Sequence, residues 1–229
     1  MGPRRSGPKG RCRVAKTVVL GLSGGVDSAV AARLLVEAGY TVYGHWLDIG
    51  LGGREAAAEV AESIGIPFSA GDIRQELETE VMVPFQRDYL AGRTPLPCAR
   101  CNPTVKFPAL FRRAEEVGAQ FVATGHYARV DVDPDTGRYR LLRGRERRKD
   151  QSYVLYQLTQ HQLRHLLLPV GDYDKRAIRE QARQAGLENA DKGDSQDICF
   201  VPDGDYVGFL QREGVVLTPG DFVDRDGRV

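Results

Sequence analysis

VVLGLSGGVDS, residues Val18 to Ser28, is the stretch that decides the fold of this chain. Its first three residues are apolar with no polar break, as in a strand that is buried on both faces. Residues Ala29 to Ala38 then recur at helical spacing and end at Gly39, a residue type that commonly terminates helices. The stretch therefore predicts a buried strand, a loop rich in glycine and serine, and a helix in direct succession.

The loop between the predicted strand and helix is suited to binding an anion. Its backbone N–H groups and the positive end of the helix dipole favour phosphate, and its glycines allow a close approach. Asp27 can hold a magnesium ion that bridges phosphate oxygens. No lysine follows the glycines as in a P-loop kinase or GTPase, and the spacing is not that of a dinucleotide fold. The simpler alternative is an ordinary glycine-rich turn.

The six residues Ser23 to Ser28, SGGVDS, resemble the phosphate loop of the PP-loop ATP pyrophosphatases. Members of that superfamily adenylate a carbonyl oxygen or a carboxylate and release pyrophosphate. The resemblance implies ATP and magnesium as cofactors. It assigns nucleotide binding to the loop residues Gly21, Leu22, Ser23, Gly24, Gly25, Val26, Asp27 and Ser28.

Composition and charge indicate a soluble globular protein. The chain has 229 residues, 41% of them hydrophobic, and a net charge of +1, so nucleic-acid binding requires a local basic patch. No apolar run reaches the roughly 18 residues of a membrane helix. Four cysteines are too few for a secreted disulfide scaffold. We therefore expect a cytoplasmic protein without a membrane partner. Residues 1–16 are basic and are predicted to be a disordered tail, with a transit peptide as the alternative.

Strands and helices alternate through the first half of the chain. Strands are predicted at 41–47, from 66 to 69 and at 120–124, and helices at 54–64, 73–89 (kinked at Pro84) and 106–117. Residues 91–103 contain three prolines and are predicted to be irregular. This alternation predicts an α/β fold, a parallel sheet with helices on both faces. Ligands of such sheets bind at the carboxyl ends of strands, where we place Leu47, Gly125 and His126. His126 is expected either to touch the nucleotide or a metal, or only to pack.

The second half of the chain carries a basic run. Five basic residues lie within the seven positions 143–149, which is typical either of a phosphate-facing hairpin or of a solvated face. Helices are predicted at 174–185 and 205–212, an apolar strand around Cys199, and strand-like residues Phe222-Val223 before an Asp226-Gly227 turn. We divide the chain into a basic tail (1–16), a PP-loop catalytic domain with a basic hairpin insertion (17–205), and the truncated start of a central domain (206–229).

Six separated motifs are similar to those of the tRNA-specific 2-thiouridylases. In chain order they are Gly21–Ser28, Gly92–Pro95, Cys101-Asn102 with Lys106-Phe107, Ala123–Arg129, Lys149–Tyr153 and Asp194–Phe200. The resemblance implies an enzyme that replaces the C2 oxygen of the wobble uridine in tRNA with sulfur, through an adenylated base. It implies tRNA and either a sulfur-donor protein or free sulfide as partners.

The resemblance also implies roles for individual residues. Cys199 would carry a persulfide, and Cys101 would be the second catalytic cysteine, which attacks the persulfide and leaves a Cys101–Cys199 disulfide. Nearby Arg100 or Lys106 would favour the thiolates. Contacts to tRNA are implied for Leu96, Pro97, Cys98, Lys149, Asp150 and Gln151, so the resemblance favours the phosphate-facing alternative for the basic run.

Two features depart from the family. Many members have Asn-Pro-Asp where this chain has Leu96-Pro97-Cys98, and members usually continue through a central domain and a C-terminal β-barrel. The departure at Cys98 opens a second chemical route, because Cys98, Cys101 and Cys199 can hold a four-iron four-sulfur cluster, with zinc as a further alternative. The alternative functions are a PP-loop sulfurtransferase for a different or smaller substrate, or a non-catalytic iron-sulfur or nucleotide-binding relative.

Overall fold

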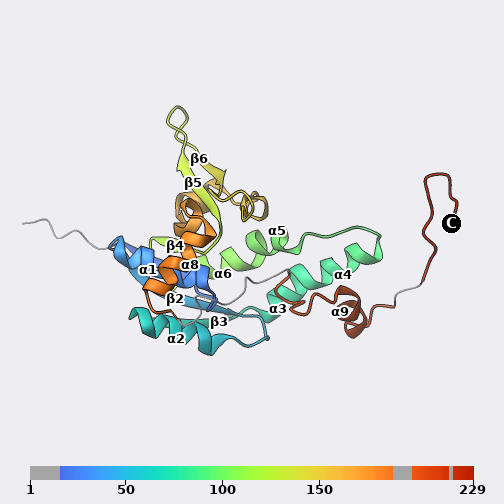
Figure 1. The fold of residues 1–229 in the computed structure, drawn as a ribbon, viewed down its shortest axis with the longest axis horizontal. Coiled ribbons are helices and arrows are strands. Elements are labelled where there is room, and N and C mark those ends of the chain that lie inside the picture. The colour runs from blue at the N-terminus through green and yellow to red at the C-terminus, as the bar shows by residue number, and fades with distance from the viewer. Residues whose placement is uncertain (1–15, 188–197, 217–218) are drawn as a thin grey trace, which may run out of the picture.

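A five-stranded parallel sheet forms the centre of the molecule in the computed structural model, which describes residues 16–187, 198–216 and 219–229 (Figure 1). The sheet has the order β3-β2-β1-β4-β7, with all neighbouring strands parallel. Its strands are β1 (Thr17–Gly21), β2 (Thr41–Asp48), β3 (Phe68–Asp72), β4 (Phe121–Ala123) and β7 (Leu166–Leu167). The predicted α/β class is confirmed. The first strand pairs with β2 on one side and β4 on the other, which is the switch point where ligands of such sheets bind.

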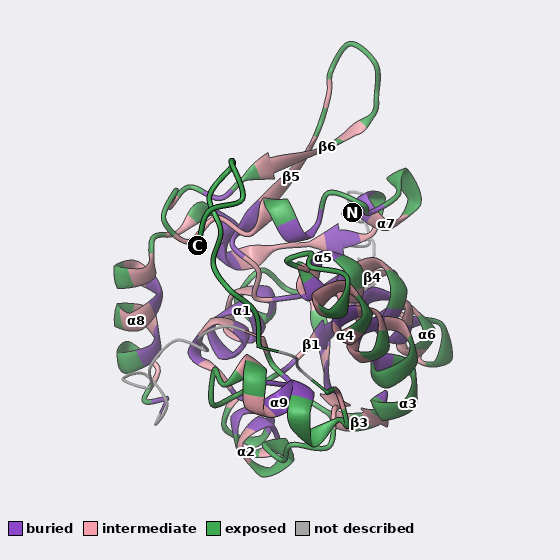
Figure 2. Ribbon diagram, turned by 90° about the vertical axis from the view of Figure 1, so that its right-hand side faces the viewer, coloured by how far each residue is buried: buried purple, intermediate pink, exposed green. Residues whose placement is uncertain are grey.

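Both faces of the sheet are covered by helices. Val18 and Leu20 pack into a cluster with residues of α1 (Val26–Glu37), α2 (Arg54–Ile64) and α8 (Lys175–Gln184). Val19, between them in sequence, packs on the other face against α6 (Phe107–Glu116). Figure 2 shows the same arrangement from outside, with the inner side of α8 buried and its outer side exposed. The three central residues of β1, Val18, Val19 and Leu20, are completely inaccessible, as the unbroken apolar run predicts.

The predicted helix at 73–89 is present but contains a wider turn. It consists of α3 (Arg74–Leu77), a π-helical turn (Glu78–Met82) and α4 (Val83–Leu90), which extends away from the sheet in Figure 1. Pro84 is the second residue after the π turn. Because proline has no N–H and clashes with the carbonyl of the preceding turn, a widened turn accommodates it without ending the helix. Phe85 of α4 then packs edge-on against Phe200 and against Phe209 of α9 (Tyr206–Arg212).

The prediction that residues 91–103 are irregular is wrong for their second half. Pro97–Cys101 form α5, Asn102–Lys106 form a second π turn, and the helix continues without a break into α6. Pro97 lies in the first turn, where its missing N–H is not needed, and Pro103 lies in the widened π turn. The buried Asn102 secures this region, since its side-chain amide donates to the carbonyls of Cys98 and Val154, each at 3.0 Å. The helix predicted to begin at Lys106 therefore begins at Pro97.

The second half differs from prediction in several places. A two-stranded antiparallel hairpin, β5 (Ala128–Val132) and β6 (Tyr139–Arg143), precedes most of the basic run, so residues 144–149 lie after the hairpin and not in it. The edge strand β7, a 3-10 turn at Ser152–Val154, helix α7 (Gln160–Arg164) and a second 3-10 turn at Pro169–Asp172 were not predicted. Cys199 lies in a turn instead of a strand, and Phe222-Val223 form no strand. The helices predicted at 174–185 and 205–212 are confirmed as α8 and α9.

Parts of two sequence predictions lie outside the described residues. These are the disordered tail before Lys16 and the Asp194–Asp197 portion of the last family motif. The predicted division at residue 205 stays a prediction. Across the ranges that the structure describes, we find no helix long and apolar enough to cross a membrane.

Gly171 should be essential for docking the hairpin to the sheet. A Cβ atom at this position would lie 1.8 Å from the carbonyl oxygen of Ala128 in β5, and backbone cannot move away cheaply. We expect Gly171→Ala to lower the free energy of unfolding by at least about 2 kcal/mol, the range of overpacked sites, as measured by urea denaturation. Gly220→Ala is the matched control, because a Cβ there meets nothing within 4 Å. Equal stability of the two variants would contradict this packing.

Candidate active site

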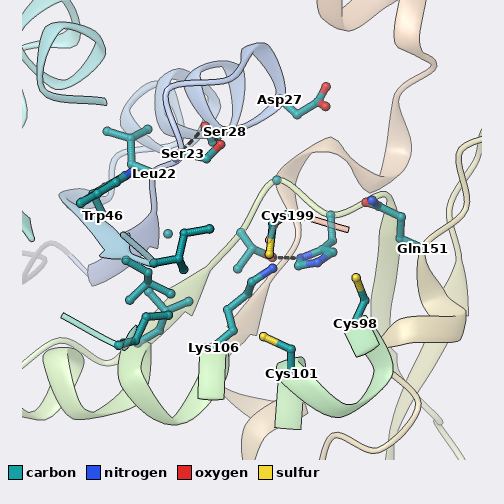
Figure 3. Close-up of a pocket in the computed structure, with 18 of the residues that line it drawn as sticks. Leu22, Ser23, Asp27, Ser28, Trp46, Cys98, Cys101, Lys106, Gln151 and Cys199 are labelled. Atoms are coloured by element: carbon teal, nitrogen blue, oxygen red, sulfur yellow. Dashed lines mark hydrogen bonds between the residues drawn. The ribbon is translucent and has the colours of Figure 1, made fainter. Parts of the chain in front are cut away.

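A cavity of about 400 Å³ lies at the carboxyl edge of the sheet, beside the glycine-rich loop (Figure 3). Most of the residues singled out in the sequence line it, although they come from distant segments. These are Gly21, Leu22, Ser23, Asp27, Ser28, Leu47, Pro97, Cys98, Cys101, Gly125, Lys149, Gln151 and Cys199. The cavity thus joins the expected nucleotide loop, both expected catalytic cysteines and part of the expected RNA-contacting segment.

The glycine-rich loop is closed by its own serines. The Ser28 hydroxyl donates to the carbonyl of Gly25 at 2.9 Å and lies 3.1 Å from the Ser23 hydroxyl, and it accepts from the Ser23 N–H at 3.2 Å. Gly24 has a φ of +73°, and a Cβ there would meet the backbone of Ala57 at 3.0 Å, so only glycine fits. As far as the chain is described, no side chain caps α1 at Gly25. Its first N–H groups can therefore serve an anion.

Three of the predicted nucleotide residues do not line the cavity. Gly24 and Gly25 shape the loop behind it, and Val26 is buried in the core beneath α1. Their contribution is therefore to the form of the loop. Leu96 and Asp150, predicted to contact tRNA, also lie off the cavity.

Asp27 is held by two residues that sequence reasoning did not single out. The Tyr127 hydroxyl donates to Asp27 Oδ1 at 2.7 Å, and Lys175 Nζ lies 2.8 Å and 2.9 Å from its two carboxylate oxygens. Lys175 comes 148 positions after Asp27, in the first turn of α8. No spacing rule connects residues so far apart. The only local signal is the helix start at Asp174, which places the next side chain near the sheet edge.

Three free cysteines line the cavity. Cys98 and Cys101 project from α5, and Cys199 approaches from the opposite side in Figure 3. Burial raises the pKa of the Cys101 thiol, and the positive charge of Lys106 opposes this shift. The pKa of Cys199 is also raised, mainly by desolvation of its thiol on the cavity side, although the residue as a whole is exposed. Lys106 is thus the cation shared by both expected catalytic thiols.

The three thiols do not form a metal site in this arrangement. Over the described ranges, no three His, Cys, Asp or Glu side chains are placed to bind one ion. His126, for which contact with a metal was one of the expected roles, is bonded through Nδ1 to the Thr124 hydroxyl at 2.8 Å and stacks on Phe107. Burial, with a smaller contribution from Lys106, lowers the pKa of His126 to about 3, so its imidazole is neutral at physiological pH. It lines the cavity as a packed, uncharged group.

The segment that follows the hairpin reaches the cavity through two side chains. Lys149 and Gln151 line it, and the Gln151 side chain accepts from the backbone N–H of Tyr127 at 2.9 Å. Asp150, between them, accepts from the N–H groups of Gly144 and Ser152 at 2.9 Å and 3.2 Å. Asp150 therefore stabilises the turn that presents its neighbours.

Comparison with known proteins identifies the family of this chain. A family model described as "tRNA methyl transferase HUP domain" matches residues 16–203. The tRNA-specific 2-thiouridylase MnmA of Carboxydothermus hydrogenoformans is 47% identical over 231 residues, which cover 93% of this chain and 63% of the relative. The chain belongs to the tRNA-specific 2-thiouridylase family. The MnmA of Heliobacterium modesticaldum is also 47% identical, with 93% and 60% covered. The chain thus spans less than two thirds of the length of these relatives.

The solved structures that resemble this chain are less similar to it in sequence than these relatives are. A 4-thiouridine synthetase in complex with RNA and ATP is 18% identical, with a TM-score of 0.49 over 86% of this chain and 50% of that chain. A predicted subunit of a tRNA methyltransferase from Methanocaldococcus jannaschii is 17% identical, with a TM-score of 0.46 over 73% and 76%. The fold assignment therefore rests on the sheet topology and the family match.

Lys106 should control the reactivity of the two cysteines that face it. Since the pKa values of Cys101 and Cys199 are raised by burial and lowered by Lys106, Lys106→Gln should raise both further. At neutral pH we expect several-fold slower alkylation of each thiol by iodoacetamide, followed by peptide mass spectrometry, and a rate curve displaced to higher pH. Lys16→Gln is the control, because its ammonium lies over the Phe121 ring, away from the cavity. Unchanged alkylation in Lys106→Gln would rule out this electrostatic role.

Proposed function

We propose that this chain carries the catalytic site of an ATP-dependent tRNA-uridine 2-sulfurtransferase, which replaces the C2 oxygen of the wobble uridine with sulfur. The observation that carries the proposal is that the phosphate loop and the two thiols, Cys101 and Cys199, line one cavity. The partners would be tRNA and a sulfur-donor protein or free sulfide. The reaction would take place in the cytoplasm, where tRNA and thiol reductants are both present.

The first half of the reaction would activate the base. A uracil C2 oxygen is a poor leaving group, and its transfer to the α-phosphate of ATP turns it into part of AMP, with pyrophosphate released. The loop N–H groups and the Ser23 hydroxyl would stabilise the charge that develops on the departing pyrophosphate. Magnesium fits the loop, because the Asp27 side chain is about one third exposed beside the cavity and this ion needs only one or two protein carboxylates beside phosphate oxygens. Bound magnesium would neutralise phosphate charge.

The second half would transfer the sulfur. The terminal sulfur of a Cys199 persulfide attacks C2 of the activated base, and AMP leaves. The Cys101 thiolate then attacks the sulfur of Cys199, and the sulfur–sulfur bond to the base breaks. Its electron pair stays on the transferred atom, so the products are 2-thiouridine and a Cys101–Cys199 disulfide. A cellular thiol reductant would reset the disulfide. Both cysteines line the cavity together, which this exchange requires.

The iron-sulfur alternative receives no support from the geometry. A cluster with three cysteine ligands needs Cys98, Cys101 and Cys199 to converge, and the described residues contain no such metal group. The reaction that we propose therefore uses neither a cluster nor zinc. In the persulfide route, Cys98 remains a thiol on the wall of the cavity, at the position predicted to contact the base.

The decisive experiment is mass spectrometry of nucleosides from tRNA incubated with the protein, ATP, magnesium and a persulfide donor. Sulfide alone is two electrons too reduced to become the outer sulfur of a Cys199 persulfide. We expect 2-thiouridine from the wild type. Asp27→Asn should slow both thiolation and pyrophosphate release by about 10²–10³-fold, the usual cost of losing one transition-state charge stabiliser. Asp221→Asn, an exposed aspartate near the C-terminus, is the matched control and should behave as wild type.

The cysteine variants separate the two halves of the reaction. Cys101→Ser and Cys199→Ser should still release pyrophosphate but form no 2-thiouridine. Wild-type protein that releases pyrophosphate without any thiolated nucleoside would exclude tRNA and favour a different or smaller substrate. Full thiolation by Asp27→Asn would overturn the assignment of the ATP loop.

The exposed cations next to Lys149 should bind tRNA phosphates. Arg147 and Arg148 are exposed in the turn after β6, directly before a residue that lines the cavity. We expect Arg147→Glu/Arg148→Glu to weaken tRNA binding without changing ATP affinity, and to flatten the salt slope by roughly 0.7–0.9 for each phosphate that the protein no longer neutralises. Arg112→Glu on α6, an exposed residue that does not line the cavity, serves as the control. Equal tRNA affinity of the double variant and the wild type at low salt would show that these residues only form a solvated surface and do not bind tRNA.

A further inference from the structure

The phosphate loop contains no lysine of its own, yet a lysine reaches it from the other end of the domain. Lys175 Nζ lies 2.8 Å and 2.9 Å from the carboxylate oxygens of Asp27, the acidic residue of the loop. Both residues line the cavity. The Lys175 ammonium is thus close enough to the loop to contact a polyphosphate that binds there.

Lys175 is held in place at its backbone and at its ammonium group. Its backbone N–H donates to the Glu146 carboxylate at 2.7 Å, and Asp174 caps α8 by accepting from the N–H of Ala177 at 2.7 Å. Its ammonium lies 5.7 Å from the centre of the Tyr127 ring, within range of a cation–π interaction. The lysine is therefore directed at the loop by the fold and not by one contact.

Burial makes a purely stabilising role for this ion pair a poor explanation. The Lys175 side chain is 12% exposed and that of Asp27 is 32% exposed. A charge pair removed from water to this extent contributes little net stability, because desolvation offsets the attraction. An ammonium has three donors, so it can bind carboxylate and phosphate oxygens together. Without the Lys175 ammonium, a triphosphate that binds to the loop would be repelled by the negative charge of Asp27.

We propose that Lys175 is a phosphate-binding residue of the nucleotide site. In the nucleotide-free protein Asp27 holds the ammonium. When ATP binds, the ammonium contacts the polyphosphate, and the Asp27 carboxylate would be available to hold magnesium. Lys175 thereby supplies, from α8, the cation that a P-loop carries within its own sequence. The inference rests on the proposed ATP site but not on the nature of the sulfur acceptor.

The test measures ATP affinity by calorimetry, with and without magnesium, in four proteins: wild type, Lys175→Met, Asp27→Asn and the double variant. The Asp27→Asn background is decisive, since a lysine that only positions Asp27 has nothing to position there. We expect Lys175→Met to weaken ATP binding about ten- to one-hundredfold in that background, with metal-free ATP as well, as for the removal of a charged hydrogen bond. Lys175→Arg should retain most of the affinity, and Lys16→Met, remote from the cavity, should retain all of it.

Two outcomes would overturn the inference. One is an Asp27→Asn/Lys175→Met protein that binds ATP as well as Asp27→Asn does, with both shown to be folded by circular dichroism. The other is a Lys175→Arg variant, equally folded, that binds ATP no better than Lys175→Met. The thiolation proposal fails separately: a wild type that shows the expected Lys175 dependence but makes no 2-thiouridine would refute that proposal and leave this inference in place.

Discussion

The complete burial of the central three residues of β1 is the constraint on which the rest of the structure depends. Val18 and Leu20 pack against one helical layer and Val19 against the other, so the strand has a single position in the sheet. Because β2 and β4 pair with it on opposite sides, the loop that leaves its carboxyl end emerges at the switch point of the sheet. The cavity, the loop serines and Asp27 all follow from this placement.

The cavity brings together charges whose effects depend on one another. Lys106 lowers the pKa values of two thiols and of His126, while burial raises the former and lowers the latter. On the other side, Lys175 neutralises Asp27. Each of these lysines therefore faces a different anion: Lys106 faces the thiols to which we assign the proposed sulfur transfer, and Lys175 faces the loop that we assign to the nucleotide. The two halves of the proposed reaction have separate cations within one cavity.

Local sequence patterns were sufficient to predict the elements whose buried residues recur at a simple period. The strand at β1, the helix α2 and the capped helices α8 and α9 all lie where hydrophobic spacing and capping residues predicted them. The candidate loop and cysteines were also found from sequence, with the help of the family resemblance, and they line one cavity. The four elements are set largely by near neighbours in the chain, whereas the cavity joins the loop and the cysteines from distant segments.

The predictions that were wrong or missing concern contacts between residues that are far apart in the sequence. Proline rules predicted an irregular segment at 91–103, but the π turn at Asn102–Lys106 and the Asn102 contact to Val154 keep its second half helical. The apolar neighbours of Cys199 suggested a strand, whereas Phe200 is buried against Phe85 of a distant helix. Lys175 reaches Asp27 across 148 positions. Contacts of this kind depend on tertiary packing, which periodicity does not report.

The second π turn has a consequence for how the thiols are aimed. A π turn is equivalent to one extra residue inserted into a continuous α-helix. One residue corresponds to about 100° of rotation, so removing it would turn the preceding segment around the axis of α6. Cys98 and Cys101, both on α5, would swing together away from the cavity wall while the helix itself stayed intact. The number of residues between Cys101 and Phe107 therefore determines the direction of both sulfur atoms, and no side chain that contacts them does so.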